Sequence, residues 1–390
     1  TLQFVIVNSL GHMWSNLPFD VLSSIFSFLS PDSLARARSS CKNWHTCGTF
    51  ITQYKPHENP TQPWFLALPI RNYQKPSCYA QNPITNNWHE ISLDFIPTQT
   101  ILKPVAPIGS LILFKVTNST TLQLVLCNPF TRQLKYLPKL NVSRTNPACG
   151  IVTIKEASDV CYFPRFRIYV AGGMSEAKHG GAVAYETTVE MYDSCVDTWE
   201  IVGSVAVEFS VRLTVWTPNE NVYVERTRSK TLYWITSARA YSVMGFDVGD
   251  NCWREFGVPH ADKLEFATLV RWNGGLGLVG GTCGGSVCVW EMSEEDDDKW
   301  CLVDEMPFEL GLRLLCGKRN WEGVKCVSDD DAICLYRELG NGMVICRKVR
   351  GLWVWVWVDG CGYIKGKKVL NCPIRGVIVI PSLACSSIFF

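Results

Sequence analysis

Residues able to do chemistry are frequent in this chain of 390 residues, but they do not gather into a catalytic pattern. The run GGLGLVGGTCGG at 274–285 is rich in glycine, yet neither a helix pattern nor a Lys-Ser/Thr pair follows it. Strand ends and tight turns therefore explain it better than phosphate binding. No P-loop, Gly-x-Ser-x-Gly elbow, HExxH or CxxC pair occurs, and the six histidines are scattered. We expect no metal site, no cofactor and no catalytic residue.

The eighteen cysteines are spread along the chain without a short regular spacing. We interpret them as reduced and mostly buried small apolar residues, since a disulfide framework belongs to small secreted chains. The formal net charge of +1 argues against direct binding of nucleic acid. The N-terminal apolar run lacks a basic flank, and no apolar run reaches about 18 residues. We therefore expect no membrane contact and a location in the nucleus, the cytoplasm or both.

Binding surfaces must then carry the function, and the composition supplies material for folded ones. Hydrophobic residues make up 47% of the chain, aromatic residues 12% and charged residues only 19%, which is typical of a globular protein. The length allows one large and one small domain. We expect a helical head at 14–50, a linker at 51–62 and a strand-rich body at 63–385.

The segment LPFDVLSSIFSFL at 17–29 carries more apolar surface than a small domain easily covers. As a helix, it places its serines toward water and these residues on a wide apolar arc: Val21, Leu22, Ile25, Phe26, Phe28 and Leu29. The sequence Ser-Pro-Asp-Ser at 30–33 ends this helix and starts another, with Asp32 or Ser33 as its cap. About forty residues in three short helices rarely form an independently stable core. We therefore expect the head to dock on something else.

The residues of this head are similar to the F-box motif over 14–50. The agreement in type and order includes Leu17-Pro18, Ser33-Leu34 and Cys41-Lys42, whereas Ser40 departs from the apolar residue usual at its place. The resemblance implies that the head binds a Skp-type adaptor and, through it, the cullin and RING subunits of an SCF-type ubiquitin ligase. The alternative is that the helices only pack on their own chain. The implied adaptor-binding residues are Leu17, Pro18, Val21, Leu22, Ile25, Phe26, Leu29, Leu34, Arg36, Cys41 and Trp44.

From about residue 63 the pattern changes to short apolar runs bounded by Gly, Pro or Asn. These runs are rich in β-branched and aromatic residues, and a long helical pattern is absent. The body is therefore expected to be all-β. Because open sheets leave unpaired strand edges, such a body is expected to close on itself.

A repeat of about 50 residues organises the body, which is the period of kelch blades. Each unit has a polar turn followed by an aromatic anchor, and Trp199, Trp253, Trp300 and Trp355 lie 54, 47 and 55 residues apart. Trp88 lies two periods before Trp199, with Tyr136 in the intermediate place. The body is thus similar to a kelch-type β-propeller, and the double glycines at 172–173 and 280–281 resemble those of kelch repeats. The other units lack the doublet.

Counting these units predicts six blades. Only one apolar strand precedes the first unit, so the strand near 376–383 is expected to complete the first blade and close the ring. A seventh blade is the alternative, because the interval from Tyr136 to Trp199 is long. Head and body together resemble the F-box/kelch class that is abundant in plants.

The resemblance implies a substrate-recognition subunit of the ligase. The ring would hold a protein substrate near a charged ubiquitin-conjugating enzyme, and the chemistry would occur on other subunits. In kelch rings, substrates often contact the loops after the second strand of each blade, which here lie near 71–75, 175–181, 237–241 and 282–286. The substrate-binding candidates are Arg71, Lys75, Lys178, His179, Arg239 and Tyr241.

Two other functions stay open. The chain could be a scaffold or transcriptional cofactor that uses the adaptor contact without degrading its partner. It could also be a small-molecule or sugar sensor or an enzyme, for which a central pocket with converging polar groups would be needed. In LWVWVWV, Trp353, Trp355 and Trp357 share one face; we expect packing between blades there, and a stacking platform is the alternative. We interpret the acidic run at 294–298 as a solvated turn.

Overall fold

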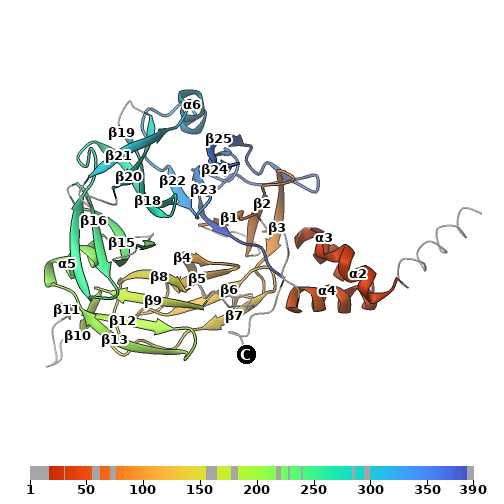
Figure 1. Ribbon diagram of the computed structural model, residues 1–390, viewed down its shortest axis with the longest axis horizontal. Helices are drawn as coiled ribbons and strands as arrows, with labels where there is room; N and C mark the ends of the chain where they lie inside the picture. The colour runs from red at the N-terminus through yellow and green to blue at the C-terminus, as the bar shows by residue number, and fades with distance from the viewer. Residues whose placement is uncertain are drawn as a thin grey trace, which may run out of the picture.

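The computed structural model describes residues 17–29, 31–54, 62–70, 76–154, 165–176, 183–216, 221–226, 229–238, 240–282, 286–293 and 299–383. Within these residues the chain forms a small helical head beside a ring of six four-stranded antiparallel sheets (Figure 1). No helix in this described part is long and apolar enough to cross a membrane.

The head consists of three helices: α2 (Phe19–Ser27), α3 (Pro31–Arg38) and α4 (Lys42–Tyr54). They enclose a small apolar core formed by Leu22, Phe26, Leu34, Ala37, Cys47 and Ile51. The start of α3 differs from the expectation, because the helix begins at Pro31 and not after a cap at Asp32 or Ser33. Proline suits the first helical position, where its missing N–H would have no intrahelical partner. Asp32 lies in the first turn and forms an ion pair with Arg36 (2.6 Å).

Six blades form the ring, as the repeat predicts, and the seven-blade alternative is wrong. Each blade is given from its inner to its outer strand. The first three blades are β28 (Ile374–Val379), β1 (Trp64–Pro69), β2 (Ser77–Asn82), β3 (Asn87–Ser92); β4 (Leu102–Ile108), β5 (Leu111–Val116), β6 (Leu124–Asn128), β7 (Gln133–Tyr136); and β8 (Ala148–Ile154), β9 (Arg165–Ala171), β12 (Thr188–Asp193), β13 (Thr198–Ser204).

The remaining three blades follow the same order. They are β14 (Asn221–Glu225), β15 (Lys230–Ser237), β16 (Tyr241–Asp247), β17 (Cys252–Gly257); β18 (Leu264–Trp272), β19 (Gly275–Thr282), β20 (Val287–Met292), β21 (Trp300–Glu305); and β22 (Lys325–Ser328), β23 (Ala332–Tyr336), β24 (Met343–Val349), β25 (Leu352–Val358). The long interval before Trp199 holds an extra hairpin, β10 (Met174–Glu176) and β11 (Val183–Tyr185), instead of a blade. A second short hairpin, β26 (Tyr363–Ile364) and β27 (Lys367–Lys368), follows β25.

The ring closes through β28, which supplies the inner strand of the first blade, as expected. This strand pairs antiparallel with β1 from Trp64↔Val379 to Pro69↔Ile374. It begins at Ile374, two residues before the expected segment. Because β28 covers the edge of β1 that β2 does not, the first blade is complete and β1 has no unpaired edge.

In the first, second and fourth blades, the same side-chain bonds hold the polar turn between the third and fourth strands. In the first blade, the Asn82 side-chain oxygen accepts hydrogen bonds from the Ile84 and Thr85 N–H groups. The Asn128 side chain in the second blade and the Asp247 side chain in the fourth accept equivalent bonds. A residue with left-handed backbone closes the turn, as Asn251 does at φ 54°. Asn and Asp favour such turns because their side chains bond the local backbone.

The periodic tryptophans hold adjacent blades together. The indole N–H of Trp199 donates to the Pro138 carbonyl at 2.9 Å, which lies after the outer strand of the preceding blade. The corresponding bonds of the first, fourth and fifth blades run from Trp88 to Asp359, from Trp253 to Ser204 and from Trp300 to Gly257. Trp355 donates to the Asp304 carboxylate instead. A contact repeated in each of these blades explains why the aromatic anchor has the period of a blade.

The second blade departs from this pattern, and the assignment of Tyr136 to the anchor place is wrong. In the strand pairing, Leu134 faces Cys127 where Trp88 faces Gln81 in the first blade. Tyr136 lies two residues further on and is largely exposed. Spacing along the chain could not separate these two residues, because the register of the pairing decides which one occupies the anchor place.

The tryptophans of β25 pack between the fifth and sixth blades, as expected. Trp353 stacks on Trp272 with ring centroids 4.1 Å apart and an interplanar angle of 11°. The Arg313 guanidinium lies over the Trp357 ring at 4.1 Å. Trp353, Trp355 and Trp357 all pack against the core shared by these two blades. Because their rings are occupied in this way, they do not form an open stacking platform.

The cysteines contribute to the interior of the ring and the head. Eight of the fifteen cysteines in the described residues are buried. Burial raises the pKa of the Cys127 thiol to about 12 and that of Cys149 to about 11. The uncharged thiol is therefore favoured at neutral pH, as for a small apolar residue.

Candidate functional site

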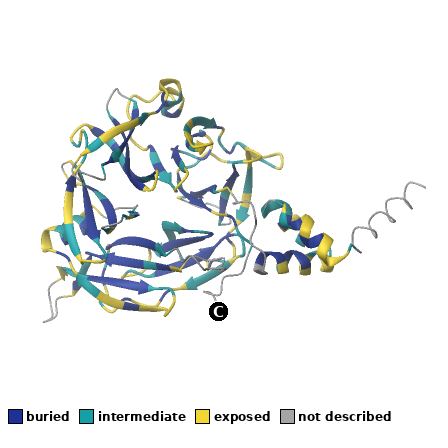
Figure 2. Ribbon diagram, viewed as in Figure 1, coloured by how far each residue is buried: buried dark blue, intermediate teal, exposed yellow. Residues whose placement is uncertain are grey.

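The wide apolar arc of α2 divides into a buried and an exposed stripe. Leu22 and Phe26, one turn apart, lie at 1% and 2% exposure in the head core. Val21, Ile25 and Phe28 follow the spacing i, i+4 and i+7, so they form one stripe of the helix, next to the buried one. Phe28 is 73% exposed, and the other two are about as exposed as Phe19. Figure 2 shows buried and exposed residues alternating along the head helices. We call Val21, Ile25 and Phe28 the exposed α2 stripe.

Several other candidate adaptor-binding residues build the head itself. Leu34 lies in the head core, and Leu17, Leu29 and Trp44 are partly buried against it. Trp44 meets the Phe26 ring edge-on at 5.3 Å. These four residues support the helices that present the exposed stripe.

The remaining candidates of the head lie nearer to solvent. Pro18 and Arg36 are exposed, and Cys41 is half-buried. The Pro18 carbonyl accepts a hydrogen bond from the Leu22 N–H at 3.0 Å and thereby starts α2. Pro18 therefore positions the first turn of the helix that carries the exposed stripe.

The head also touches the ring, but through α3 and not through the exposed stripe. Arg38 donates to the Leu383 carbonyl at 3.3 Å, and Leu383 packs against the head core. A cleft of about 770 Å³ lies between α3 and the ring and is lined by Ala35, Trp88 and Phe130 among others. Figure 1 shows α3 beside the first blade. Packing on the chain's own ring therefore leaves the exposed α2 stripe uncovered by the described residues.

The two faces of the ring differ in what they carry. The inner strands contact one another in cyclic order, and each begins on the same face. Two short helices connect an outer strand with the next inner strand on this face: α5 (Val207–Val215) and α6 (Phe308–Leu315). We call it the α5–α6 face. In the first blade, β1 runs from Trp64, paired with Val379 at the end of β28, to Pro69, paired with Ile374 at the start of β28. The start of β1, to which the head is joined, therefore lies on the face opposite the α5–α6 face.

Most candidate substrate-binding residues fall outside the part of the chain that the structure describes. This holds for Arg71, Lys75, Lys178, His179 and Arg239, and for the acidic run at 294–298. Tyr241, the sixth candidate, is described.

Tyr241 begins β16 and is half-buried, packing against the core between the fourth and fifth blades. Burial raises the pKa of its hydroxyl. Tyr241 therefore presents only part of its ring to a partner.

Sequence reasoning missed the two helices of the ring. Their segments, VEFSVRLTV and FELGLRLL, are short, and the first is rich in β-branched residues, so both resemble strands in an all-β pattern. Each helix exposes apolar residues: Val207 and Val215 on α5, and Phe308 and Leu312 on α6. The α5–α6 face thus combines open apolar helix surface with the ends of the blades.

The double glycines allow these connecting segments to pack closely. A Cβ on Gly173, whose φ is +93°, would lie 2.8 Å from the Thr145 carbonyl oxygen, and the Gly173 N–H donates to the Thr214 hydroxyl of α5 at 2.7 Å. In the fifth blade, a Cβ on Gly281 would lie 2.8 Å from the Trp321 ring, which follows α6. Only glycine leaves room for such contacts.

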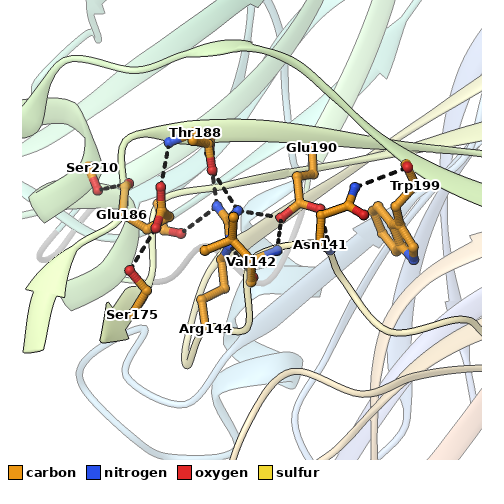
Figure 3. Close-up of polar contacts among 10 residues, drawn as sticks. Asn141, Val142, Arg144, Ser175, Glu186, Thr188, Glu190, Trp199 and Ser210 are labelled. Atoms are coloured by element: carbon orange, nitrogen blue, oxygen red, sulfur yellow. Dashed lines mark hydrogen bonds and ion pairs between the residues drawn. The ribbon is translucent and has the colours of Figure 1, made fainter. Parts of the chain in front are cut away.

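A buried ion pair fixes the connection from β7 to β8 on this face (Figure 3). The Arg144 and Glu190 side chains are both fully buried and lie 2.5 Å apart. Arg144 also donates to the carbonyls of Thr188 (2.8 Å) and Gly172 (3.3 Å). Burial lowers the pKa of Arg144, and the nearby Glu190 opposes that shift. The guanidinium thus connects three segments of the third blade.

Glu190 extends the same network to the backbone of the connection. Its carboxylate accepts the N–H groups of Asn141 (2.7 Å) and Val142 (3.1 Å). Beside it, Glu186 accepts the Ser175 hydroxyl at 2.6 Å and the Thr188 N–H at 2.9 Å (Figure 3). Every partner is a structural group of the face, so this cluster stabilises the loops of the α5–α6 face.

Comparison with known proteins defines the class to which this architecture belongs. Residues 14–49 match the family model described as F-box-like. The chain therefore has an F-box-like domain in its head, which is joined to a six-bladed propeller.

Its relatives are plant proteins. Over 373 residues the chain is 21% identical to Protein UNUSUAL FLORAL ORGANS of Arabidopsis thaliana, covering 89% of this chain and 79% of that protein. It is 22% identical to F-box only protein 6 of the same plant, with 92% and 72% covered. It is 25% identical to the F-box/kelch-repeat protein At5g43190, with 96% and 89% covered. The similarity to F-box/kelch-repeat proteins of the plant type therefore extends through the ring.

Proposed function

We propose that this chain is the substrate-recognition subunit of an SCF-type ubiquitin ligase. The exposed α2 stripe of the F-box-like head would bind a Skp-type adaptor and, through it, the cullin and RING subunits. The observation that carries the proposal is this stripe of Val21, Ile25 and Phe28, which the head core and the ring both leave open. Contiguous exposed apolar residues on a soluble domain mark an interaction surface.

The ring would hold the protein to be ubiquitinated, on the α5–α6 face. The head is joined to the opposite end of the first blade, so a protein held on that face would not compete with the adaptor. The chain would act by proximity, raising the effective concentration of target lysines near the conjugating enzyme. It would do so in the nucleus, the cytoplasm or both.

The adaptor contact can be tested with two matched variants of the full chain. Phe28→Asp places a carboxylate in the exposed α2 stripe, and Thr46→Asp places the same charge at an exposed position of α4, outside the stripe. We expect a purified Skp-type adaptor to bind the wild type and Thr46→Asp and to lose at least tenfold in affinity for Phe28→Asp. Equal binding of both variants, or no binding of the wild type, would overturn the proposal. Thermal unfolding of each variant shows whether the head is still folded.

The degradative role needs a separate readout. With the ligase reconstituted around this chain, a partner captured by the ring is expected to gain ubiquitin in the wild type and not in Phe28→Asp. A partner that stays bound and unmodified in the complete ligase would instead support a scaffold or transcriptional cofactor.

A further inference from the structure

A cavity of about 330 Å³ occupies the axis of the ring between the inner strands. Its apolar lining comes from Val105, Leu269, Val327 and Val377. Three cationic side chains line it as well: Lys103 of β4, Lys325 of β22 and Arg375 of β28. We call these three residues the channel cations. The net charge of the whole chain, +1, gives no indication of this cluster of three cations.

The fold explains why these cations meet although their positions span most of the sequence. Lys103 and Arg375 are each the second residue of an inner strand, and Lys325 is the first residue of another. The inner strands β22, β28 and β4 are consecutive neighbours around the axis. Residues at matching strand positions in neighbouring blades therefore lie around one end of the channel, on the α5–α6 face.

Charges of the same sign lie near the channel cations. Lys103, Lys325 and Arg375 are half-buried. Burial, followed by the charges of Lys115, Arg375 and Lys325, lowers the pKa of Lys103 to about 8. Burial and the charge of Arg375 also lower the pKa of Lys325. Like charges held together in a partly desolvated site make the cationic state costly, and an anion between them removes that cost.

Within the described residues, neither Lys325 nor Arg375 forms an ion pair with a carboxylate. The Lys325 ammonium donates to the Ile374 carbonyl at 2.6 Å, which fixes its position beside Arg375. Asn221 of β14 lines the same cavity, and its side-chain oxygen accepts the Ile151 N–H at 2.9 Å. The Asn221 amide group thus has donors left for a ligand.

We propose that the axial channel of the ring binds a phosphoryl group, with Lys103, Lys325 and Arg375 as its ligands. A phosphoryl group carries close to two negative charges and three acceptor oxygens, which matches three cations from three neighbouring strands better than a single carboxylate does. The volume suits one such group on a small molecule or on a side chain inserted from the α5–α6 face, and excludes a folded segment. This site does not depend on the adaptor contact.

Binding can be measured on the full chain by isothermal titration with three ligands: inorganic phosphate, pyrophosphate and N-acetyl-phosphoserine amide. We expect the wild type to bind at least one of them, and Lys325→Met to bind it at least tenfold more weakly. Lys367→Met removes the same charge from the exposed hairpin β26–β27 and is expected to bind as the wild type does. Tighter binding of the phosphoserine amide than of both inorganic anions would identify a phosphorylated side chain as the source. Tighter binding of the inorganic anions than of the phosphoserine amide would identify a free phosphorylated small molecule as the ligand.

A stability measurement separates a binding role from a purely structural one. Lys325→Met relieves repulsion among the channel cations, so without phosphate we expect its melting temperature to be no lower than that of the wild type. Phosphate is expected to raise the melting temperature of the wild type but not that of Lys325→Met. Binding of none of the three ligands to the wild type, or equal binding to the wild type and Lys325→Met, would overturn the proposal. Lys325→Met is expected to bind the adaptor as the wild type does. Measuring adaptor binding therefore distinguishes a failure of the phosphoryl-site proposal from a failure of the proposed function.

Discussion

Replacing Arg144 by Met tests whether the buried ion pair holds the α5–α6 face together. The substitution leaves the Glu190 carboxylate fully buried with only the N–H groups of Asn141 and Val142 as partners. Removing one member of a buried pair typically costs about 3–5 kcal/mol, because a buried charge stays uncompensated. For a large domain this corresponds to a melting temperature lowered by roughly 6–15 °C, at about 2–3 °C per kcal/mol.

Thermal unfolding followed by tryptophan fluorescence at a fixed scan rate provides the assay. Arg132→Met is the matched control, because Arg132 forms an ion pair with Asp94 in which both side chains are more than half exposed. Such exposed pairs contribute about 0–1 kcal/mol, so this variant is expected to melt close to the wild type.

A double variant makes the reasoning sharper. Arg144→Met combined with Glu190→Leu removes both charges and is expected to melt higher than Arg144→Met alone, although two backbone N–H groups lose their acceptor. This non-additivity follows because replacing a buried pair costs less than breaking it. Equal melting of Arg144→Met and Arg132→Met, or a double variant that loses the sum of the two single losses, would refute the argument.

Three further predictions concern the ring. Trp253→Phe removes one hydrogen bond between blades and is expected to cost about 0.5–1.5 kcal/mol in chemical denaturation; an unchanged midpoint would contradict the role given to the periodic tryptophans. Burial raises the pKa of Asp329 to about 6, so the folded state binds an extra proton there between pH 4 and 6, and the contribution of Asp329 to stability falls as pH rises through that range. Asp329→Asn is expected to lack this fall, and parallel melting curves from pH 4 to 7 would count against it. Gly150→Ala places a Cβ 2.5 Å from the buried Trp234 ring and is expected to cost about 1–3 kcal/mol, whereas Gly257→Ala, with nothing within 4 Å, is expected to be silent.

The number of blades could be predicted because one contact recurs in most of them. An indole N–H that reaches the preceding blade requires a tryptophan at the same place in each unit, so the period of the sequence reports the period of the structure. The second blade shows the limit of this signal. It has Leu134 at that place, and the nearby Tyr136 imitates the expected spacing.

The parts that escaped prediction depend on contacts between distant residues. Arg144 and Glu190 are 46 positions apart, and neither has a local pattern that marks it as buried. The channel cations come from blades at opposite ends of the sequence and meet only because the ring closes. Likewise, α5 packs on Gly172, and the segment after α6 packs on Gly281 through Trp321. These contacts support the short helices beyond their own sequence preferences.

The closing strand β28 also sets an order of events during synthesis. The ribosome makes β28 roughly 280 residues after β3, which at about 5–20 residues per second is a delay of roughly 15–60 s. Throughout this delay β1 has a free edge, and that edge could pair with another nascent chain. A message truncated before the codon for Ile374 would yield a permanently open ring. Completion of translation therefore acts as a checkpoint, and unfinished chains are expected to be recognised by chaperones and proteases.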